Sequence, residues 1–341
     1  MPAVLKKRDI VQRILDGRPR VAAKASGFGK AWANIAVCKY WGKRNEELNL
    51  PVTSSLSVSL NGHGTETTIA PNPGRDEVFL SGRPIASSSQ FGKGVVSFLN
   101  MFRPDLNTFF RVETTNTIAT AAGLASSASG FAALTFAVND LHGWNLGGRE
   151  LSILARMGSG SACRSVFDGF VEWNSGASAD GMDSFAEPLA TEWPDLRLGL
   201  IKVSTVPKAV SSRTAMKRTK RTSALYEAWP VKVSHDLMLL KEAISTGNFD
   251  MFGQVAESNA LAMHATMIGA WPPVLYWLPE SVAVMQDIWE AREQGLRVYF
   301  TMDAGPNIKL LFLAQDSATV EKHFPGVDVV MPFARAAGAE K

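Results

Sequence analysis

The sequence has few of the residues that build disulfide or metal frameworks. It contains two cysteines among 341 residues, Cys38 and Cys163, and its five histidines are scattered. Two cysteines cannot cross-link a chain of this length into a disulfide framework, and no metal-ligand spacing surrounds them. The composition therefore excludes a small disulfide-stabilised protein, argues against a zinc site and is typical of a reducing cytoplasm.

Long apolar runs are also missing. Residues 4–15 form a short basic amphipathic pattern rather than the apolar core of a signal peptide. The most apolar late segment, residues 271–278, contains Pro272 and Pro273 and is followed by Pro279, so we expect no membrane span. With 46% hydrophobic and 20% charged residues, the composition is that of an ordinary soluble globular protein, long enough for two domains.

Acidic residues are scarce in two segments, although the net charge is only +3. Residues 1–44 hold eleven Lys or Arg against two Asp, and residues 198–226 hold seven basic residues and no acid. Such runs are usually solvated faces, but they also fit a nucleic-acid stripe or a pocket for a small polyanion. The second run lacks the interleaved aromatics that single-strand binders use, which argues against nucleic acid.

The order of the secondary-structure patterns predicts an α+β fold. Strand-like alternation dominates the first part of the chain, and long helical patterns follow after about residue 208. We expect a boundary near residues 195–210, which divides the chain into an N-terminal extension (1–28), an N-terminal domain (29–200) and a C-terminal domain (201–341). The main expected helices are 92–102, 126–141, 150–157, one beginning near 161, 235–245, 249–263 and 282–293. The main expected strands are 35–37, 56–60, 67–69, 78–80, 109–114, 169–173, 198–203, 297–302 and 308–313.

A small-residue loop, residues 120–130, is the first chemical signal. Glycine and alanine allow a close approach of the backbone to a ligand, and the serines add hydroxyl donors where an apolar-striped helix begins. Free N–H groups and the positive dipole end of that helix suit a phosphate. A tightly packed helix entrance is the alternative. The candidate phosphate-binding residues are Gly123, Leu124, Ala125, Ser126, Ser127 and Ser129.

Four ordered blocks of sequence carry a family resemblance. The loop resembles the ATP-phosphate loop of the galactokinase, homoserine kinase, mevalonate kinase and phosphomevalonate kinase superfamily. Residues 34–44 with 50–58, residues 158–173 and residues 303–307 are similar to three signatures of one branch, the diphosphomevalonate decarboxylases. Together the blocks run from Ala33 to about Leu313, most of the chain.

The resemblance implies the two-domain α+β fold of that superfamily, with the active site in the cleft between the domains. It also implies a cytoplasmic homodimeric lyase of isoprenoid biosynthesis that uses ATP and Mg²⁺. Such an enzyme would convert mevalonate 5-diphosphate to isopentenyl diphosphate, ADP, phosphate and CO₂, with no nucleic-acid or membrane partner. Three alternatives stay open: a mevalonate-monophosphate decarboxylase or mevalonate 3-kinase, a non-catalytic ATP-binding relative, and a nucleic-acid-binding protein.

Two candidate catalytic residues follow from the resemblance. Asp303 ends an apolar strand just before a Gly-Pro turn, where a carboxylate could orient or deprotonate a hydroxyl. Its local alternative is an Asp that accepts backbone bonds in its own turn. Arg164 lies near the start of an expected helix and could bind the substrate carboxylate or pair with Asp303. A surface arginine is the alternative there.

The substrate-binding candidates also rest on the resemblance. Ser212 and Arg213 lie in the acid-free run, where they start a stretch of basic and hydroxyl residues, and they match the stretch that contacts a diphosphate in the family. His264, at a helix end, fits an interface packing residue as well as a ligand contact. The first signature adds the remaining candidates, Lys39, Tyr40, Trp41 and Lys43. The sequence suggests no magnesium ligands.

Overall fold

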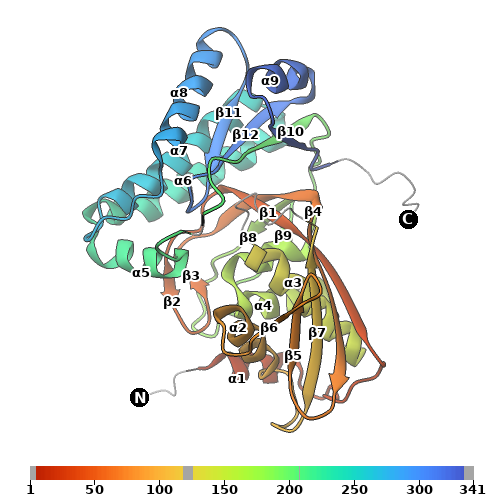
Figure 1. Ribbon diagram of the computed structural model, residues 1–341. Helices are drawn as coiled ribbons and strands as arrows, with labels where there is room; N and C mark the ends of the chain where they lie inside the picture. The colour runs from red at the N-terminus through yellow and green to blue at the C-terminus, as the bar shows by residue number, and fades with distance from the viewer. Residues whose placement is uncertain (1–4, 118–125, 207, 334–341) are drawn as a thin grey trace.

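The computed structural model describes residues 5–117, 126–206 and 208–333. A seven-stranded sheet with its helices forms the N-terminal part, and a four-stranded sheet with long helices forms the C-terminal part (Figure 1). The predicted α+β class with two parts is therefore confirmed.

The N-terminal sheet is built around two long antiparallel strands, β1 (Gly27–Cys38) and β4 (Ser55–Asn72). Helix α3 (Ser126–His142) packs on both of them. Glycine at position 29 permits this, because a Cβ there would collide with the Ala133 carbonyl of α3. The other elements of this part are β5 (Glu77–Leu80), β6 (Arg83–Ile85), α2 (Gln90–Leu99), β7 (Phe109–Asn116), α4 (Gly148–Gly158), β8 (Phe170–Trp173) and β9 (Ala186–Pro188).

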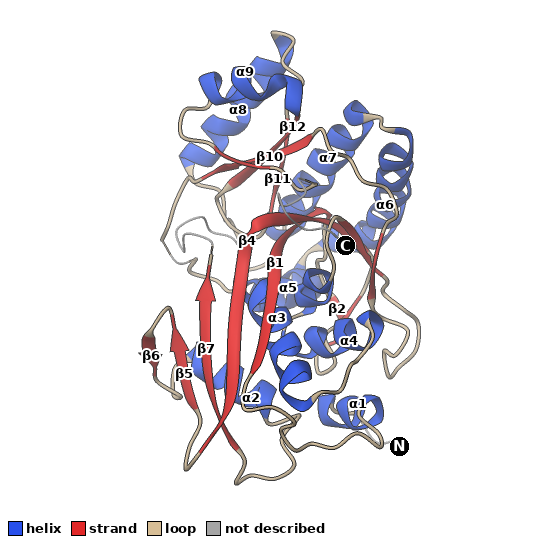
Figure 2. Ribbon diagram, turned by 90° about the vertical axis from the view of Figure 1, so that its right-hand side faces the viewer, coloured by secondary structure: helices blue, strands red, loops and turns tan. Residues whose placement is uncertain are grey.

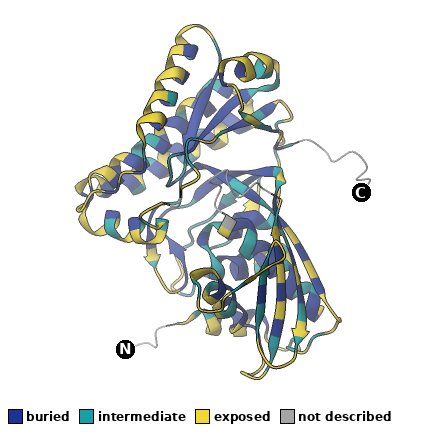
Figure 3. Ribbon diagram, viewed as in Figure 1, coloured by how far each residue is buried: buried dark blue, intermediate teal, exposed yellow. Residues whose placement is uncertain are grey.

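In the C-terminal sheet the strand order is β11-β12-β10-β13, and the paired neighbours are all antiparallel. Long helices cover this sheet (Figure 2), with buried residues on their inner sides and exposed residues on their outer sides (Figure 3). The strands are β10 (Leu196–Ile201), β11 (Tyr299–Met302), β12 (Ile308–Leu313) and β13 (Asp328–Val330). The helices are α5 (Ser212–Thr222), α6 (Trp229–Thr246), α7 (Phe249–Ile268), α8 (Pro279–Glu293) and α9 (Ser317–His323).

The two parts share one apolar core. Val37 and Leu56 of the N-terminal sheet belong to the same buried cluster as Leu198, Trp229 and Phe252 of the C-terminal part. Burial of these side chains stabilises the junction by roughly 1.5–3 kcal/mol each. The end of β1 is thus held firmly against α7, and this junction positions the segment that follows β1.

The N-terminal segment is part of this packing. Helix α1 (Lys7–Ile14) buries Ile10, Val11 and Ile14 in the N-terminal core. Of the predicted boundaries, 28/29 falls within β1 and 200/201 falls within β10, whose strand partners are all C-terminal. The predicted division of the chain stays a prediction.

The main predicted strands and long helices are present with shifted ends. The helix expected near residue 161 is instead a short 3-10 helix, η2 (Gly160–Val166). It follows Ser159, whose backbone is extended, and a side chain at residue 160 would collide with the Tyr40 ring. The helical segment is only seven residues long between two extended residues, Ser159 and Phe167, and 3-10 geometry is typical of such short segments. Two further 3-10 helices are η3 (Ala224–Ala228) and η4 (Ala314–Asp316).

Candidate active site

Asp303 lies directly after the fully buried strand β11 and is held between two lysines. Lys39 Nζ is 2.9 Å from one carboxylate oxygen, and Lys309 Nζ is 3.5 Å from the other. Both lysine side chains are almost completely buried, whereas the Asp303 side chain is 35% exposed. The Asp303 carboxylate therefore faces solvent at one side and two cations at the other.

The two lysines keep Asp303 ionised. Burial raises the pKa of the Asp303 carboxyl, but the charges of Lys39 and Lys309 outweigh this and hold the pKa well below its usual range. Burial also lowers the pKa of Lys39 to about 8, against the attraction of Asp303. At neutral pH the pair is thus a carboxylate and an ammonium group.

The backbone around Asp303 is fixed by α7. His264 Nε2 donates a hydrogen bond of 3.1 Å to the Asp303 carbonyl, and its ring stacks on Trp277. Burial lowers the pKa of His264 to about 4, so its imidazole is neutral at pH 7. Asn259 accepts a hydrogen bond of 2.8 Å from the Lys39 backbone N–H. Of the two readings of His264, its hydrogen bond and stacking favour the packing role.

Arg164 lies in η2 and is buried, with an exposure of 2%. Its guanidinium donates to the Ser55 hydroxyl at 2.5 Å and to the Asn34 side-chain oxygen at 3.3 Å. Among the residues that the structure describes, no carboxylate lies within 4.0 Å of it, so it does not form an ion pair with Asp303. The Asp303 charge nonetheless raises the pKa of Arg164 against the effect of burial, which lowers it. Arg164 is a buried cation that neutral groups hold in place.

Tyr40 and Trp41 differ in their surroundings. The buried Tyr40 hydroxyl has no hydrogen-bond partner within the described residues, and the ring packs edge-on against Trp173 with centroids 4.8 Å apart. The Trp41 side chain is 2% exposed and belongs to the shared core, and its carbonyl accepts hydrogen bonds from Tyr226 and Trp229. Tyr40 thus offers a free hydroxyl, whereas Trp41 mainly anchors the segment after β1.

Lys43 lies at the other end of this segment, in the short strand β2 (Lys43–Asn45). Its Nζ is 2.7 Å from the Asn49 side-chain oxygen and 3.7 Å from Glu46. Burial and then the charge of Arg213 lower the pKa of Lys43 to about 8. Lys39 and Lys43, which the sequence places together, therefore face different groups: Lys39 contacts Asp303, whereas Lys43 contacts Asn49 and Glu46.

Arg213 and Ser212 open helix α5. The Arg213 side chain is exposed, and no carboxylate of the described residues lies within 4.0 Å of it. Ser212 accepts a hydrogen bond of 2.9 Å from Lys208 Nζ, which also donates to the Ala304 carbonyl at 2.8 Å. Lys208 thus connects the start of α5 to the turn after Asp303.

Lys208 and Lys309 were not among the predicted residues. Lys309 stands alone as a charged residue within the apolar run of β12 (Ile308–Leu313), and such a lysine requires a buried anionic partner. That signal could have indicated it. Lys208 has no comparable signal, because it lies in a loop that is already basic.

The structure describes only some of the candidate ATP-binding residues. Gly123, Leu124 and Ala125 lie outside the described residues. Helix α3 begins at Ser126, immediately after them, and Ser127 is exposed in its first turn. Ser129 is buried, and its hydroxyl forms a 2.8 Å hydrogen bond with Thr65 of β4. Its side chain therefore contacts the sheet.

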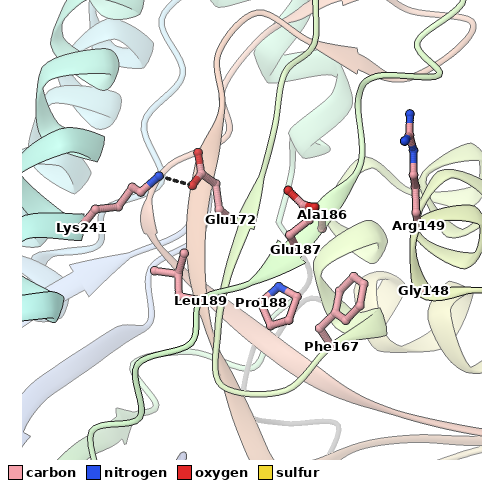
Figure 4. Close-up of a pocket in the computed structure, with 9 residues that line it drawn as sticks. All are labelled: Gly148, Arg149, Phe167, Glu172, Ala186, Glu187, Pro188, Leu189 and Lys241. Carbon is pink, nitrogen blue, oxygen red and sulfur yellow. Dashed lines mark hydrogen bonds and ion pairs between the residues drawn. The ribbon is translucent and has the colours of Figure 1, made fainter.

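Other features of the surface lie apart from these residues. None of the predicted site residues lines a cavity of about 620 Å³. In Figure 4, Lys241 points toward Glu172 on one side of this cavity, and Arg149 lies on the other side. No group of three or more acidic, histidine or cysteine side chains suited to a metal occurs in the described ranges. Within the same residues, no helix is long and apolar enough to span a membrane.

Comparison with known families covers both parts of the chain. The profile of the diphosphomevalonate decarboxylase-like N-terminal domain matches residues 31–186. The profile of the mevalonate 5-diphosphate decarboxylase C-terminal domain matches residues 200–334.

Individual relatives agree with these profiles. The diphosphomevalonate decarboxylase of Aspergillus fumigatus is 38% identical over 84% of this chain and 76% of its own length. A mevalonate diphosphate decarboxylase structure from Enterococcus faecalis is 43% identical, with a TM-score of 0.83 over 90% of this chain and 96% of that one. The structure of the Staphylococcus aureus enzyme is 36% identical, with a TM-score of 0.86 over 92% of this chain and 97% of that one. Another structure, 43% identical with a TM-score of 0.85 over 90% of this chain and 96% of that one, is a complex with MVAPP, AMPPCP and magnesium. By its sequence and its fold, this chain belongs to the diphosphomevalonate decarboxylase family.

Proposed function

We propose that this protein converts mevalonate 5-diphosphate to isopentenyl diphosphate, with ATP consumed and ADP, phosphate and CO₂ released. One observation carries this proposal beyond family membership. Lys39, which follows strand β1, holds the ionised Asp303 carboxylate, and Asn34 of the same strand holds Arg164, a buried cation with no carboxylate within 4.0 Å among the described residues. A substrate that has both a hydroxyl and a carboxylate complements this arrangement.

The reaction needs each of these charges. ATP phosphorylates the tertiary hydroxyl at C3, since hydroxide is a poor leaving group. The C3–O bond then breaks with its electron pair on the departing phosphate. The C1–C2 bond pair forms the C2=C3 double bond as CO₂ leaves. The protein must therefore orient a hydroxyl, hold a carboxylate and tolerate positive charge at a tertiary carbon.

Asp303 is assigned to the C3 hydroxyl. Its carboxylate is anionic at neutral pH and partly exposed, so it can accept a hydrogen bond from that hydroxyl and direct the oxygen toward ATP. A carboxylate of such low pKa is a weak base, which favours orientation over early proton removal. Its negative charge also stabilises cationic character at C3.

Arg164 is assigned to the substrate carboxylate. Ser55 and Asn34 fix the direction of its guanidinium without neutralising it. A buried cation of this kind gains most from an anionic ligand, because its desolvation is otherwise uncompensated. The Tyr40 hydroxyl is a further donor for the same ligand, because it has no partner of its own within the described residues.

Lys43, Ser212 and Arg213 are assigned to the diphosphate, and the first turn of α3 to the ATP phosphates. The free N–H groups of a helix N-terminus and the exposed Ser127 suit phosphate oxygens. Magnesium would neutralise phosphate charge during transfer. Mg²⁺ is usually held by substrate phosphates with one or two carboxylates, so a protein cage of three acids is not required.

Product analysis tests the proposed function. The protein is incubated with ATP, Mg²⁺ and either mevalonate 5-diphosphate or mevalonate 5-phosphate, and CO₂ and phosphate are measured. We expect both products in equal amounts, with the diphosphate preferred. Phosphorylation without CO₂ would indicate a 3-kinase instead, and preference for the monophosphate would overturn the substrate assignment.

A homodimer in the cytoplasm completes the proposal, as the family resemblance implies. Sedimentation velocity at micromolar concentration tests the assembly, for which we expect twice the chain mass.

A further inference from the structure

Helix α1 lies before the segment that the family profile matches, which begins at residue 31. It packs beside the hairpin formed by β2 and β3 (Leu50–Pro51), since Ile10 and Val11 share a buried cluster with Leu48 and Leu50. The Lys7 backbone N–H also donates a 3.2 Å hydrogen bond to Glu47 within the hairpin. These contacts fix the first turn of α1 against the residues that follow Lys43.

Helix α5 lies close to the same hairpin from the other side. Lys220 Nζ donates a 2.6 Å hydrogen bond to the Lys43 carbonyl. In both Figures 1 and 2 the strand β2 lies between α5 and α1. The hairpin thus brings the start of α1 close to the diphosphate candidates, although more than 30 residues separate Lys7 from Lys43 in the sequence.

Three cations belong to the elements that meet at this hairpin, Lys7 of α1, Lys43 of β2 and Arg213 of α5, and we call them the hairpin cations. Burial lowers the pKa of the half-buried Lys7, the Glu47 charge opposes this, and the Arg213 charge adds a smaller lowering effect. Burial lowers the pKa of Lys43, and the charges of Arg213 and, less strongly, Lys7 add to this effect. Within the described part of the chain, neither the Lys7 ammonium group nor the Arg213 guanidinium has a carboxylate within 4.0 Å, although the Lys7 backbone N–H contacts Glu47. Glu46 and Glu47 offset part of this charge, but the three cations still disfavour one another's charged forms, and a ligand anion placed among them would relieve that repulsion.

We propose that Lys7 is a third cationic ligand of the substrate's diphosphate, so that α1 completes the phosphate-binding end of the site. This inference rests on the proposed function, because it takes Lys43 and Arg213 as diphosphate contacts. Two phosphates carry more charge than one, and a third cation therefore favours the diphosphate over the monophosphate.

The test compares Lys7→Met with Lys6→Met. Methionine keeps the helix propensity and the apolar stem but removes the charge, and Lys6 is an exposed neighbour. Dissociation constants for mevalonate 5-diphosphate, mevalonate 5-phosphate and inorganic pyrophosphate are measured by calorimetry without ATP. We expect Lys7→Met to weaken binding of the diphosphate and of pyrophosphate by roughly 3- to 10-fold. This range lies between the small effect of losing an exposed ion pair and the larger effect of losing a buried one, because Lys7 is half-buried. The monophosphate should change by less than about twofold, since it engages fewer of the cations.

Two further measurements separate a ligand role from a structural one. Lys7→Arg should restore the diphosphate preference, and thermal unfolding of Lys7→Met should match that of Lys6→Met. Unchanged diphosphate binding in Lys7→Met, or an equal loss for all three ligands, overturns the proposal. A parent protein that binds pyrophosphate but releases no CO₂ contradicts the proposed function alone, and pyrophosphate affinity then decides the role of Lys7.

Discussion

The two ends of the site use cations in opposite ways. Near Asp303, Lys39 and Lys309 lie within ion-pair distance of one carboxylate and keep it charged. Near the hairpin, the side-chain cations of Lys7 and Arg213 have no carboxylate at that distance within the described residues, and their charges add to the burial that lowers the pKa of Lys43. Paired cations tune a protein group, whereas unpaired cations remain available to a ligand anion. Substitutions at the first end should therefore act mainly on turnover, and those at the second mainly on affinity.

The largest effect is expected at Asp303. Asp303→Asn removes the charge that orients the hydroxyl and leaves Lys39 and Lys309 without their anion, so kcat should fall at least ~10³-fold. Measurement of CO₂ release under saturating substrate checks this, with the exposed Asp287→Asn as control. Retained nucleotide binding would show that the fold persists. A variant that turns over within about tenfold of the parent would remove Asp303 from the mechanism.

Arg164→Lys tests the buried cation between the two ends. Lysine retains the charge but lacks the planar guanidinium group. It therefore cannot donate hydrogen bonds to Ser55 and Asn34 while it also binds a carboxylate through two further N–H groups. We expect a loss of roughly 10²- to 10³-fold in kcat/KM, largely in kcat. Steady-state measurement of kcat and KM checks this, with the variant Arg83→Lys, at an exposed position, as the control. Near-normal kinetics would indicate a structural role for Arg164.

Arg213→Ala probes the unpaired end. A charge-assisted hydrogen bond contributes about 1.5–3 kcal/mol, so binding of the diphosphate should weaken by roughly 10- to 100-fold. Some loss of rate should follow, because remote phosphate binding helps to position the reacting carbon. The decisive quantity is the ratio of kcat/KM for diphosphate and monophosphate, with Arg221→Ala on the same helix as control. If Arg213→Ala leaves this ratio unchanged, the diphosphate binds elsewhere.

The sequence predicted much of the fold because the periodic patterns were strong. The alternation in residues 56–60 and the helical spacing in 249–263 correspond to parts of β4 and α7. It did not predict the 3-10 geometry of η2 or the close approach of the Tyr40 ring to Gly160. Local patterns carry no information on such a long-range contact.

The site was only partly predictable for the same reason. Motifs indicated Asp303, Arg164 and Lys43, but not which cation faces which anion. Lys309 reaches Asp303 because β12 pairs antiparallel with β11, and Lys7 reaches the hairpin because α1 is buried beside it. Strand pairing and helix docking decide both placements, and neither has a local signature. The roles given to these residues stay predictions.

Lys309→Met should have the smallest effect at neutral pH and the most informative pH dependence. Lys309 helps to hold the pKa of Asp303 below its usual range, so Asp303 should stay ionised in the parent protein at about pH 5 and at still lower pH. Without Lys309 the pKa of Asp303 rises, because burial then opposes ionisation against Lys39 alone. The acid limb of the kcat profile should move to higher pH, while kcat at pH 7.5 should fall by less than about tenfold. The exposed Lys322→Met is the matched control, and its profile should coincide with that of the parent. An acid limb at the same pH in Lys309→Met and in the parent would mean that Lys39 alone fixes the charge of Asp303, and the distinction between paired and unpaired cations would then rest on a single ion pair.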